Sequence, residues 1–108
     1  MSGPDRALHR LAATIAARAE ANPDSSWTAR LLARGPEKCA EKFGDEAVEA
    51  VIEAVRGDPA RLTCEAADVL YHLLVMCAAR GVTLAEIEAE LARRESQSGL
   101  AEKSARPR

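Results

Sequence analysis

The chain has 108 residues and a formal net charge of -2, so we expect a single domain spanning residues 1–108, and a pI near 5.7 argues against nucleic-acid binding. Ala accounts for 23 residues and aromatic side chains for only 3%; because Ala is the best helix former and buries little surface, this composition favours closely spaced helices. Since small domains bury a small share of their surface, we expect the chain to assemble as a homodimer.

Three sequence features argue against a membrane or secreted protein. The longest uncharged apolar run, Val69–Ala79, is too short to span a bilayer. The N-terminal residues lack the apolar segment of a signal peptide. The three cysteines form no CxxC pair and are read as reduced, packed thiols: Cys39, Cys64 and Cys77. We therefore expect a cytoplasmic protein.

In the first part of the chain, helix-breaking residues separate two predicted helices. Residues Pro4–Glu20 place apolar side chains at helical spacing, and Pro suits the first turn. After a polar loop, Ser25 or Ser26 caps a short helix over Trp27–Ala33, which ends before Gly35.

Two long predicted helices follow, over Pro36–Val55 and Pro59–Ala79. Between them Gly57 and Asp58 form a tight turn, with Asp58 as the N-cap of the second helix. This second helix contains the uncharged segment VLYHLLVMCAA and ends at Gly81. We therefore expect an antiparallel helical hairpin at the centre of the fold.

A last predicted helix covers Leu84–Arg94. Thr83 is its N-cap, and Glu86 completes a capping box three residues later. Residues 96–108 form a polar tail, which we expect to be flexible. Because no segment has the period-two alternation of a strand, the sequence predicts an all-α fold of four to five helices.

Two groups of carboxylates lie on the two long predicted helices. Glu46 and Glu49 share one helix face, and Glu65 and Asp68 have the same spacing of three residues. In an antiparallel hairpin the two pairs face each other, and four carboxylates at one place repel unless a cation neutralises them. Oxygen ligands of this kind suit Mg²⁺ or Mn²⁺, which bridge to substrate phosphates.

The same acids also fit a solvated helix surface. Glu46, Glu49 and Glu53 lie opposite an apolar stripe formed by Val48, Val51, Ile52 and Val55, as on any surface helix. The following helix, however, is apolar on all sides after Asp68, which is typical of a buried helix. Buried carboxylates need a partner, so the two helices together favour a metal site over a solvated face.

Basic residues near the acids are candidates for binding phosphate. Lys38 and Lys42 lie one turn apart on the helix face that carries Glu46, although pairing between Lys42 and Glu46 is the simpler alternative. The predicted helix N-terminus at Pro36 also offers N–H groups to an anion, which is a weak signal by itself.

Four ordered blocks resemble the phosphoribosyl-ATP pyrophosphatase family over nearly the whole chain. Residues 26–38, SWTARLLARGPEK, resemble its S-[YW]-T-x-x-L-L-x-x-G-x-x-K signature. Residues 42–49, KFGDEAVE, are similar to its K-x-G-E-E-x-x-E block, and residues 65–72, EAADVLYH, match E-x-A-D-x-x-Y-H. Residues 98–103 resemble the C-terminal end of the family.

This resemblance implies a dimeric, MazG-like helical bundle that hydrolyses phosphoribosyl-ATP to phosphoribosyl-AMP and pyrophosphate, the second step of histidine biosynthesis. It implies Mg²⁺ as the cofactor and four metal-binding carboxylates: Glu46, Glu49, Glu65 and Asp68. Asp45 stands where the family usually has Glu and is a further candidate ligand.

The predicted catalytic residues are Glu46 and Glu49, one of which orients or deprotonates the attacking water. The residues predicted to neutralise phosphates are Lys38, Lys42, Arg30 and Arg34, with plain surface charge as the alternative for the arginines. His72 is interpreted as a hydrogen-bonded core or interface residue, with contact to the substrate as the alternative. Trp27 is interpreted either as a stacking surface for a base or as a packing anchor.

Two other functions remain open from the sequence. A MazG-type (d)NTP pyrophosphatase would share the acids but does not need residues 26–38. A non-catalytic helical dimerisation module would carry the same acids only as a solvated face.

Overall fold

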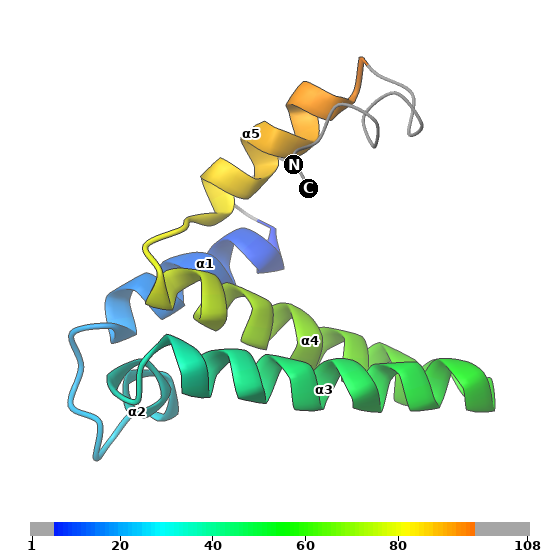
Figure 1. The fold of residues 1–108 in the computed structure, drawn as a ribbon, viewed down its shortest axis with the longest axis horizontal. Coiled ribbons are helices and arrows are strands. Elements are labelled where there is room, and N and C mark those ends of the chain that lie inside the picture. The colour runs from blue at the N-terminus through cyan, green and yellow to red at the C-terminus, as the bar shows by residue number, and fades with distance from the viewer. Residues whose placement is uncertain (1–5, 97–108) are drawn as a thin grey trace.

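The computed structural model describes residues 6–96, which form five α-helices (Figure 1). The helices are α1 (Ala7–Arg18), α2 (Trp27–Ala33), α3 (Pro36–Arg56), α4 (Pro59–Ala79) and α5 (Leu84–Arg94). Residues 6–96 contain no β-strand, so the all-α prediction is confirmed. The predicted helix start at Pro4 and the tail beyond residue 96 lie outside the described residues.

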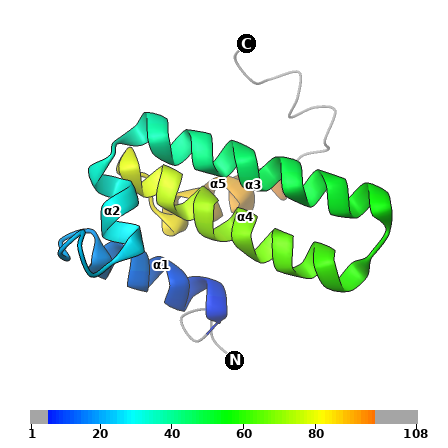
Figure 2. The same cartoon turned by 90° about the horizontal axis from the view of Figure 1, so that it is seen from below.

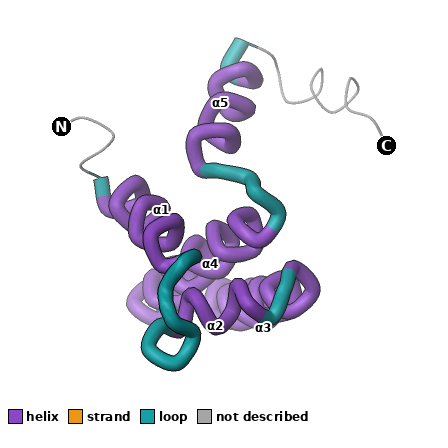
Figure 3. The backbone as a smooth tube through the Cα atoms, turned by 90° about the vertical axis from the view of Figure 1, so that its left-hand side faces the viewer, coloured by secondary structure: helices purple, strands orange, loops and turns teal. Residues whose placement is uncertain are grey.

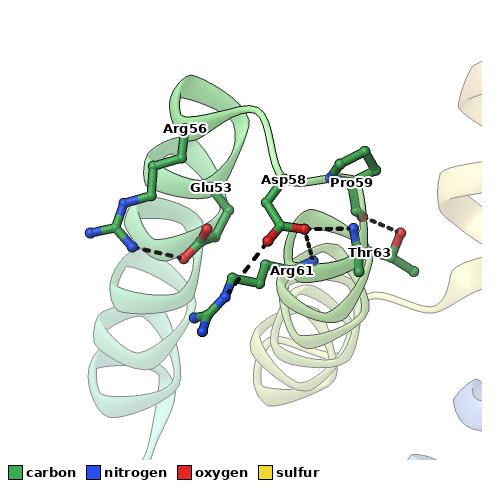
Figure 4. Close-up of polar contacts among 7 residues, drawn as sticks. Glu53, Arg56, Asp58, Pro59, Arg61 and Thr63 are labelled. Atoms are coloured by element: carbon green, nitrogen blue, oxygen red, sulfur yellow. Dashed lines mark hydrogen bonds and ion pairs between the residues drawn. The ribbon is translucent and has the colours of Figure 1, made fainter.

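Helices α3 and α4 form the predicted antiparallel hairpin and lie side by side along their length (Figures 1 and 2). Gly57 ends α3 with φ 83°, a left-handed conformation that glycine adopts without a Cβ clash. The Asp58 carboxylate then accepts hydrogen bonds from the backbone N–H groups of Ala60 and Arg61, and Pro59 occupies the first turn of α4 (Figure 4).

The core lies at the end of the hairpin away from this turn, where α1 and α2 pack against α4. Its fully buried apolar residues are Ile15, Leu31, Cys39, Leu74 and Val75. The side chain of Ser26 accepts from the backbone N–H of Ala29, which identifies it as the α2 cap. The hydroxyl of Thr28 on α2 is hydrogen-bonded to that of Tyr71 on α4, which links the two helices.

Helix α5 leads away from the hairpin (Figures 1 and 3). Thr83 and Glu86 form the predicted capping box, with Glu86 N–H donating to Thr83 Oγ1 at 3.1 Å. His9 Nε2 lies 2.9 Å from Glu88 Oε2, which joins α1 to α5. Both side chains line an open apolar groove of about 530 Å³, which is formed by α1, the end of α4 and the start of α5.

The apolar stripe of α3 does not face the core. Val51 and Val55 are 62% and 83% exposed, whereas Glu53 on the opposite side is 5% exposed. The side of α3 that packs against α4 therefore carries Glu46 and Glu53, and the valines point outward. The pattern predicted the two faces correctly, but the usual assignment of the apolar face to the core is wrong for this helix.

The prediction that the segment of α4 after Asp68 is buried on all sides is only partly correct, because three of its residues are buried and the others are half-buried or exposed. His72, Leu74 and Val75 are buried, but Leu70 is 44% exposed and Asp68 is exposed. The packing assignment is also wrong for one cysteine, since Cys64 is exposed while Cys39 is buried. The physical reason is that α1 and α2 cover α4 only near its C-terminal end.

Among residues 6–96, α4 is long and apolar enough to cross a membrane by length and composition alone. The core helix of a soluble protein meets the same criterion. Here α4 is the helix on which α1, α2 and α3 all pack.

Candidate functional site

Three carboxylates from the two hairpin helices converge at one place. Glu46 of α3, Glu65 of α4 and Asp68 of α4 each present a ligand atom, and these atoms all lie within 4.8 Å of one another. Glu46 and Glu65 are half-buried and Asp68 is exposed. We call this set the carboxylate trio. It is open on one side, so an ion bound there retains access to solvent or to a phosphate.

The electrostatics of the trio disfavour three negative charges. Burial raises the pKa of the Glu65 carboxyl above its ordinary value, and the neighbouring carboxylates of Asp68 and Glu46 raise it further. Glu49 and Glu53 add to the same effect. A cation in the middle of these oxygens would reverse the sign of the local potential and favour the ionised forms.

Two predicted ligands lie on α3 beside the trio but do not belong to it. Glu49 and Asp45 are both exposed. Glu49 is one helical turn from Glu46, and its charge acts on Glu65. The structure therefore brings together three of the four predicted metal-binding carboxylates, and the roles of Glu49 and Asp45 remain predictions.

Glu53 was grouped with these acids from the sequence, but no role was assigned to it. The structure buries this side chain and leaves its Oε1 atom without a hydrogen-bond partner. Its other oxygen, Oε2, lies 3.7 Å from Arg56 Nη1 (Figure 4). The sequence pattern shows that Glu53 lies on the acidic face of α3. It does not show that the side chain is buried, because the burial results from packing against α4.

His72 is a buried residue on α4, next to the trio. Burial lowers the pKa of its imidazole, and the charges of Glu46, Lys42 and Asp68 act on the same ring. Its Nδ1 atom has no hydrogen-bond partner among the described residues, and its ring meets that of Tyr71 edge-on at 4.9 Å. This burial agrees with the core interpretation and keeps the imidazole neutral at pH 7.

The predicted phosphate-binding residues are arranged around the N-terminal half of α3. Lys42 is half-buried, one turn before Glu46. Lys38 Nζ lies 3.5 Å from Glu41 Oε1, in a surface ion pair. On α2, Arg30 Nε donates to the carbonyl of Pro23 at 3.2 Å, and Arg34 is exposed. Of these four residues, Lys42 is therefore the one that lies one helical turn from a member of the trio.

Trp27 begins α2 and is 53% exposed. An exposed indole has a free face on which a base can stack, whereas a packing anchor would be covered. The structure therefore does not support the packing interpretation within residues 6–96.

Comparison with known proteins identifies relatives over almost the full chain. The profile of the family described as phosphoribosyl-ATP pyrophosphohydrolase matches residues 8–95. A phosphoribosyl-ATP pyrophosphatase of Cereibacter sphaeroides (strain ATCC 17025) is 78% identical over 99 residues, covering 92% of this chain and 96% of the relative. The enzyme of that name from Paracoccus denitrificans is 69% identical over 107 residues, covering 98% and 99%. This chain belongs to the phosphoribosyl-ATP pyrophosphohydrolase family.

Proposed function

We propose that this chain hydrolyses phosphoribosyl-ATP to phosphoribosyl-AMP and pyrophosphate in histidine biosynthesis. The observation that carries the proposal is the carboxylate trio between α3 and α4, in a chain whose relatives are named phosphoribosyl-ATP pyrophosphatase. The products require that water cleave the bond between the α- and β-phosphates. Since the substrate and both products are small and water-soluble, we propose that the enzyme acts in the cytoplasm.

The donor set of the trio suits a divalent cation. Three carboxylate oxygens within 4.8 Å of one another match the oxygen ligands that Mg²⁺ prefers, and Mn²⁺ accepts the same set. The raised pKa of Glu65 indicates that these groups repel one another in the absence of a counter-charge. When bound, the cation would offset the negative charge that develops on the phosphate oxygens.

The residues of the chain would then position water and the phosphates. Glu49 is exposed one turn from Glu46, and in this proposal one of the two carboxylates orients the attacking water or accepts its proton. Lys42, on the same helix face, would hold a phosphate oxygen by charge. Lys38, Arg30 and Arg34 would reach phosphates further from the trio.

We also propose that the active form is a homodimer that buries the outward face of α3. Four apolar residues are exposed there: Val48, Val51, Ile52 and Val55. A helix face of this kind costs free energy when it is left in water, and a second copy of the same chain offers a matching face. Leu70 on α4 is a further exposed apolar residue.

The decisive experiment is to measure pyrophosphate release from phosphoribosyl-ATP and from a panel of dNTPs. We expect turnover of phosphoribosyl-ATP in the presence of Mg²⁺, and its loss in Glu46→Gln. Turnover of dNTPs alone would instead assign the chain to the MazG-type (d)NTP pyrophosphatases. The absence of any turnover would favour a dimerisation module.

A further inference from the structure

Polar contacts at both ends of α2 tie this short helix to the long hairpin. Near its N-terminal end, the hydroxyl of the buried residue Thr28 is hydrogen-bonded to the hydroxyl of Tyr71 on α4. Near its C-terminal end, the Cys39 thiol of α3 donates to the carbonyl oxygen of Leu31 at 3.3 Å. A helix of seven residues is too short to be stable in water by itself. These contacts and the packing around them therefore determine where α2 lies.

The contact with Tyr71 lies close to the carboxylate trio. Tyr71 follows Asp68 by three residues, so the two residues are neighbours one turn apart on α4. The Tyr71 ring meets the ring of His72 edge-on at 4.9 Å, and the charges of Glu46 and Asp68 act on the His72 imidazole. The residues Thr28, Tyr71 and His72 therefore connect α2 to the trio without a break.

Trp27 comes directly before Thr28, and 53% of it is exposed. The ribose separates the base of a nucleotide from its phosphates, so phosphates bound at the trio leave the base outside it. An exposed aromatic face on the neighbouring helix offers a stacking surface for that base. Because Trp27 adjoins Thr28 in the first turn of α2, the hydrogen bond to Tyr71 fixes the place of the tryptophan relative to α4.

We propose that Thr28 and Tyr71 are positioning residues for the substrate. Their hydrogen bond holds α2 in the place from which Trp27 stacks on the base of a nucleotide whose phosphates lie at the trio. This inference rests on the proposed function, because it requires a nucleotide bound there. Without the hydrogen bond, α2 occupies that place in only a fraction of the molecules, and the affinity for the nucleotide falls in proportion.

The first test is the hydrolysis of phosphoribosyl-ATP by Tyr71→Phe and by Thr28→Val in saturating MgCl₂, well below the melting temperature of each variant. We expect KM to rise about 5-fold or more, the size of effect that one hydrogen bond has on an equilibrium, with a much smaller change in kcat. Thr28→Ser keeps the hydroxyl and should restore most of the wild-type KM. Thr28→Val gives the same test if Tyr71→Phe does not fold.

Two matched measurements separate positioning from other effects. Thr63→Val removes another threonine hydroxyl, which donates to the carbonyl of Pro59 within α4 at 2.8 Å, and should leave KM unchanged. Titration with MnCl₂ in the absence of nucleotide, followed by calorimetry, should give the same dissociation constant for the wild type and for Tyr71→Phe, because the trio is intact in both.

Trp27 supplies two direct readouts. It is the only tryptophan of the chain, so its fluorescence should be quenched when the product phosphoribosyl-AMP binds. We expect the dissociation constant from this titration to be about 5-fold higher in Tyr71→Phe. Trp27→Ala should also raise KM, and adding Tyr71→Phe to it should raise KM no further, because both changes act through one contact.

The possible failures are distinguishable. If the wild type hydrolyses phosphoribosyl-ATP and Tyr71→Phe lowers only the melting temperature, the hydrogen bond is purely structural, and the inference is overturned while the proposed function stands. The same conclusion follows if Tyr71→Phe raises KM equally with and without Trp27, or if it weakens the binding of MnCl₂. If the wild type does not hydrolyse phosphoribosyl-ATP, both proposals are overturned.

Discussion

Glu46 on α3 and Asp68 on α4 present carboxylate oxygens within 4.8 Å of each other, across the two arms of the helical hairpin. The antiparallel geometry produces this approach, because the tight turn at Gly57 and Asp58 sets the register of one helix against the other. A change at either acid, or in the turn, is therefore expected to act on the same site.

The first prediction concerns Glu65 and pH. Its folded-state pKa is raised above the ordinary value of 4.5 by burial and by the neighbouring acids. The stability that its protonation supplies is therefore fully present below pH 4.5 and is lost as pH rises through the folded pKa. In EDTA, the stability of the wild type relative to Glu65→Gln should rise as pH falls from 7 toward 4.5, measured by urea denaturation. If the difference in stability between the wild type and Glu65→Gln did not change with pH, the carboxylates of the trio would not repel one another as described.

His72 should show the opposite dependence. Burial lowers its folded-state pKa below the ordinary value of 6.5, so its contribution is present above pH 6.5 and is lost as pH falls through the folded pKa. We expect the imidazole resonances of His72 in an NMR titration to shift with a midpoint below 6.5. A midpoint at or above 6.5 would mean that the charges of Glu46 and Asp68, which raise this pKa, outweigh the effect of burial.

The exposed stripe of α3 is expected to control assembly. The double change Val51→Glu and Val55→Glu places two charges on the proposed interface. We expect the wild type to elute as a dimer and this variant as a monomer, with mass measured by light scattering. The matched control is Leu91→Glu on α5, which is also exposed. If Leu91→Glu dissociates the dimer and the double change does not, the interface lies on α5 instead.

Cys39 and Cys64 should differ sharply in their reactivity toward thiol reagents and in the stability that is lost when each is replaced by alanine. Cys39 is 1% exposed, its thiol donates to the carbonyl of Leu31, and burial raises the pKa of the thiol. Cys64 is exposed. A thiol reagent at pH 8 should therefore label Cys64 well before Cys39.

The matching alanine variants test the same contrast through stability. Cys39→Ala should lower the free energy of unfolding by about 1–2 kcal/mol, while Cys64→Ala should change it by less than about 0.5 kcal/mol. Equal costs for the two variants would be inconsistent with the observed packing.

The cap of α4 provides the last prediction. Asp58 Oδ1 accepts hydrogen bonds from the N–H groups of Ala60 and Arg61 at 3.0 and 3.2 Å. Asp58→Ala removes both and should cost about 1 kcal/mol, whereas Asp58→Asn, an equally good N-cap, should cost much less. Thermal denaturation in EDTA measures both variants. A similar loss of stability in Asp58→Ala and Asp58→Asn would show that the charge of Asp58 contributes more than its capping hydrogen bonds.

Features that depend only on neighbouring residues could be predicted from the amino-acid sequence. Helix bounds follow from local signals: Asp58 and Thr83 each supply a side-chain cap, and Gly57 ends α3 with a positive φ. The spacing of three residues between Glu65 and Asp68 indicated that they share one helix face. The motif blocks indicated the protein family.

Which face of each helix is covered depends on how the helices pack, and the sequence pattern did not predict it. On α3 the valines are exposed and Glu53 is buried, the reverse of what amphipathic patterning favours, because the side of α3 that carries Glu46 and Glu53 packs against α4. Likewise, α1 and α2 cover only the C-terminal half of α4, so Asp68 stays accessible while His72 is buried. Local propensity determines where a helix runs, but burial depends on contacts between residues far apart in the chain, and those contacts form only when the helices pack.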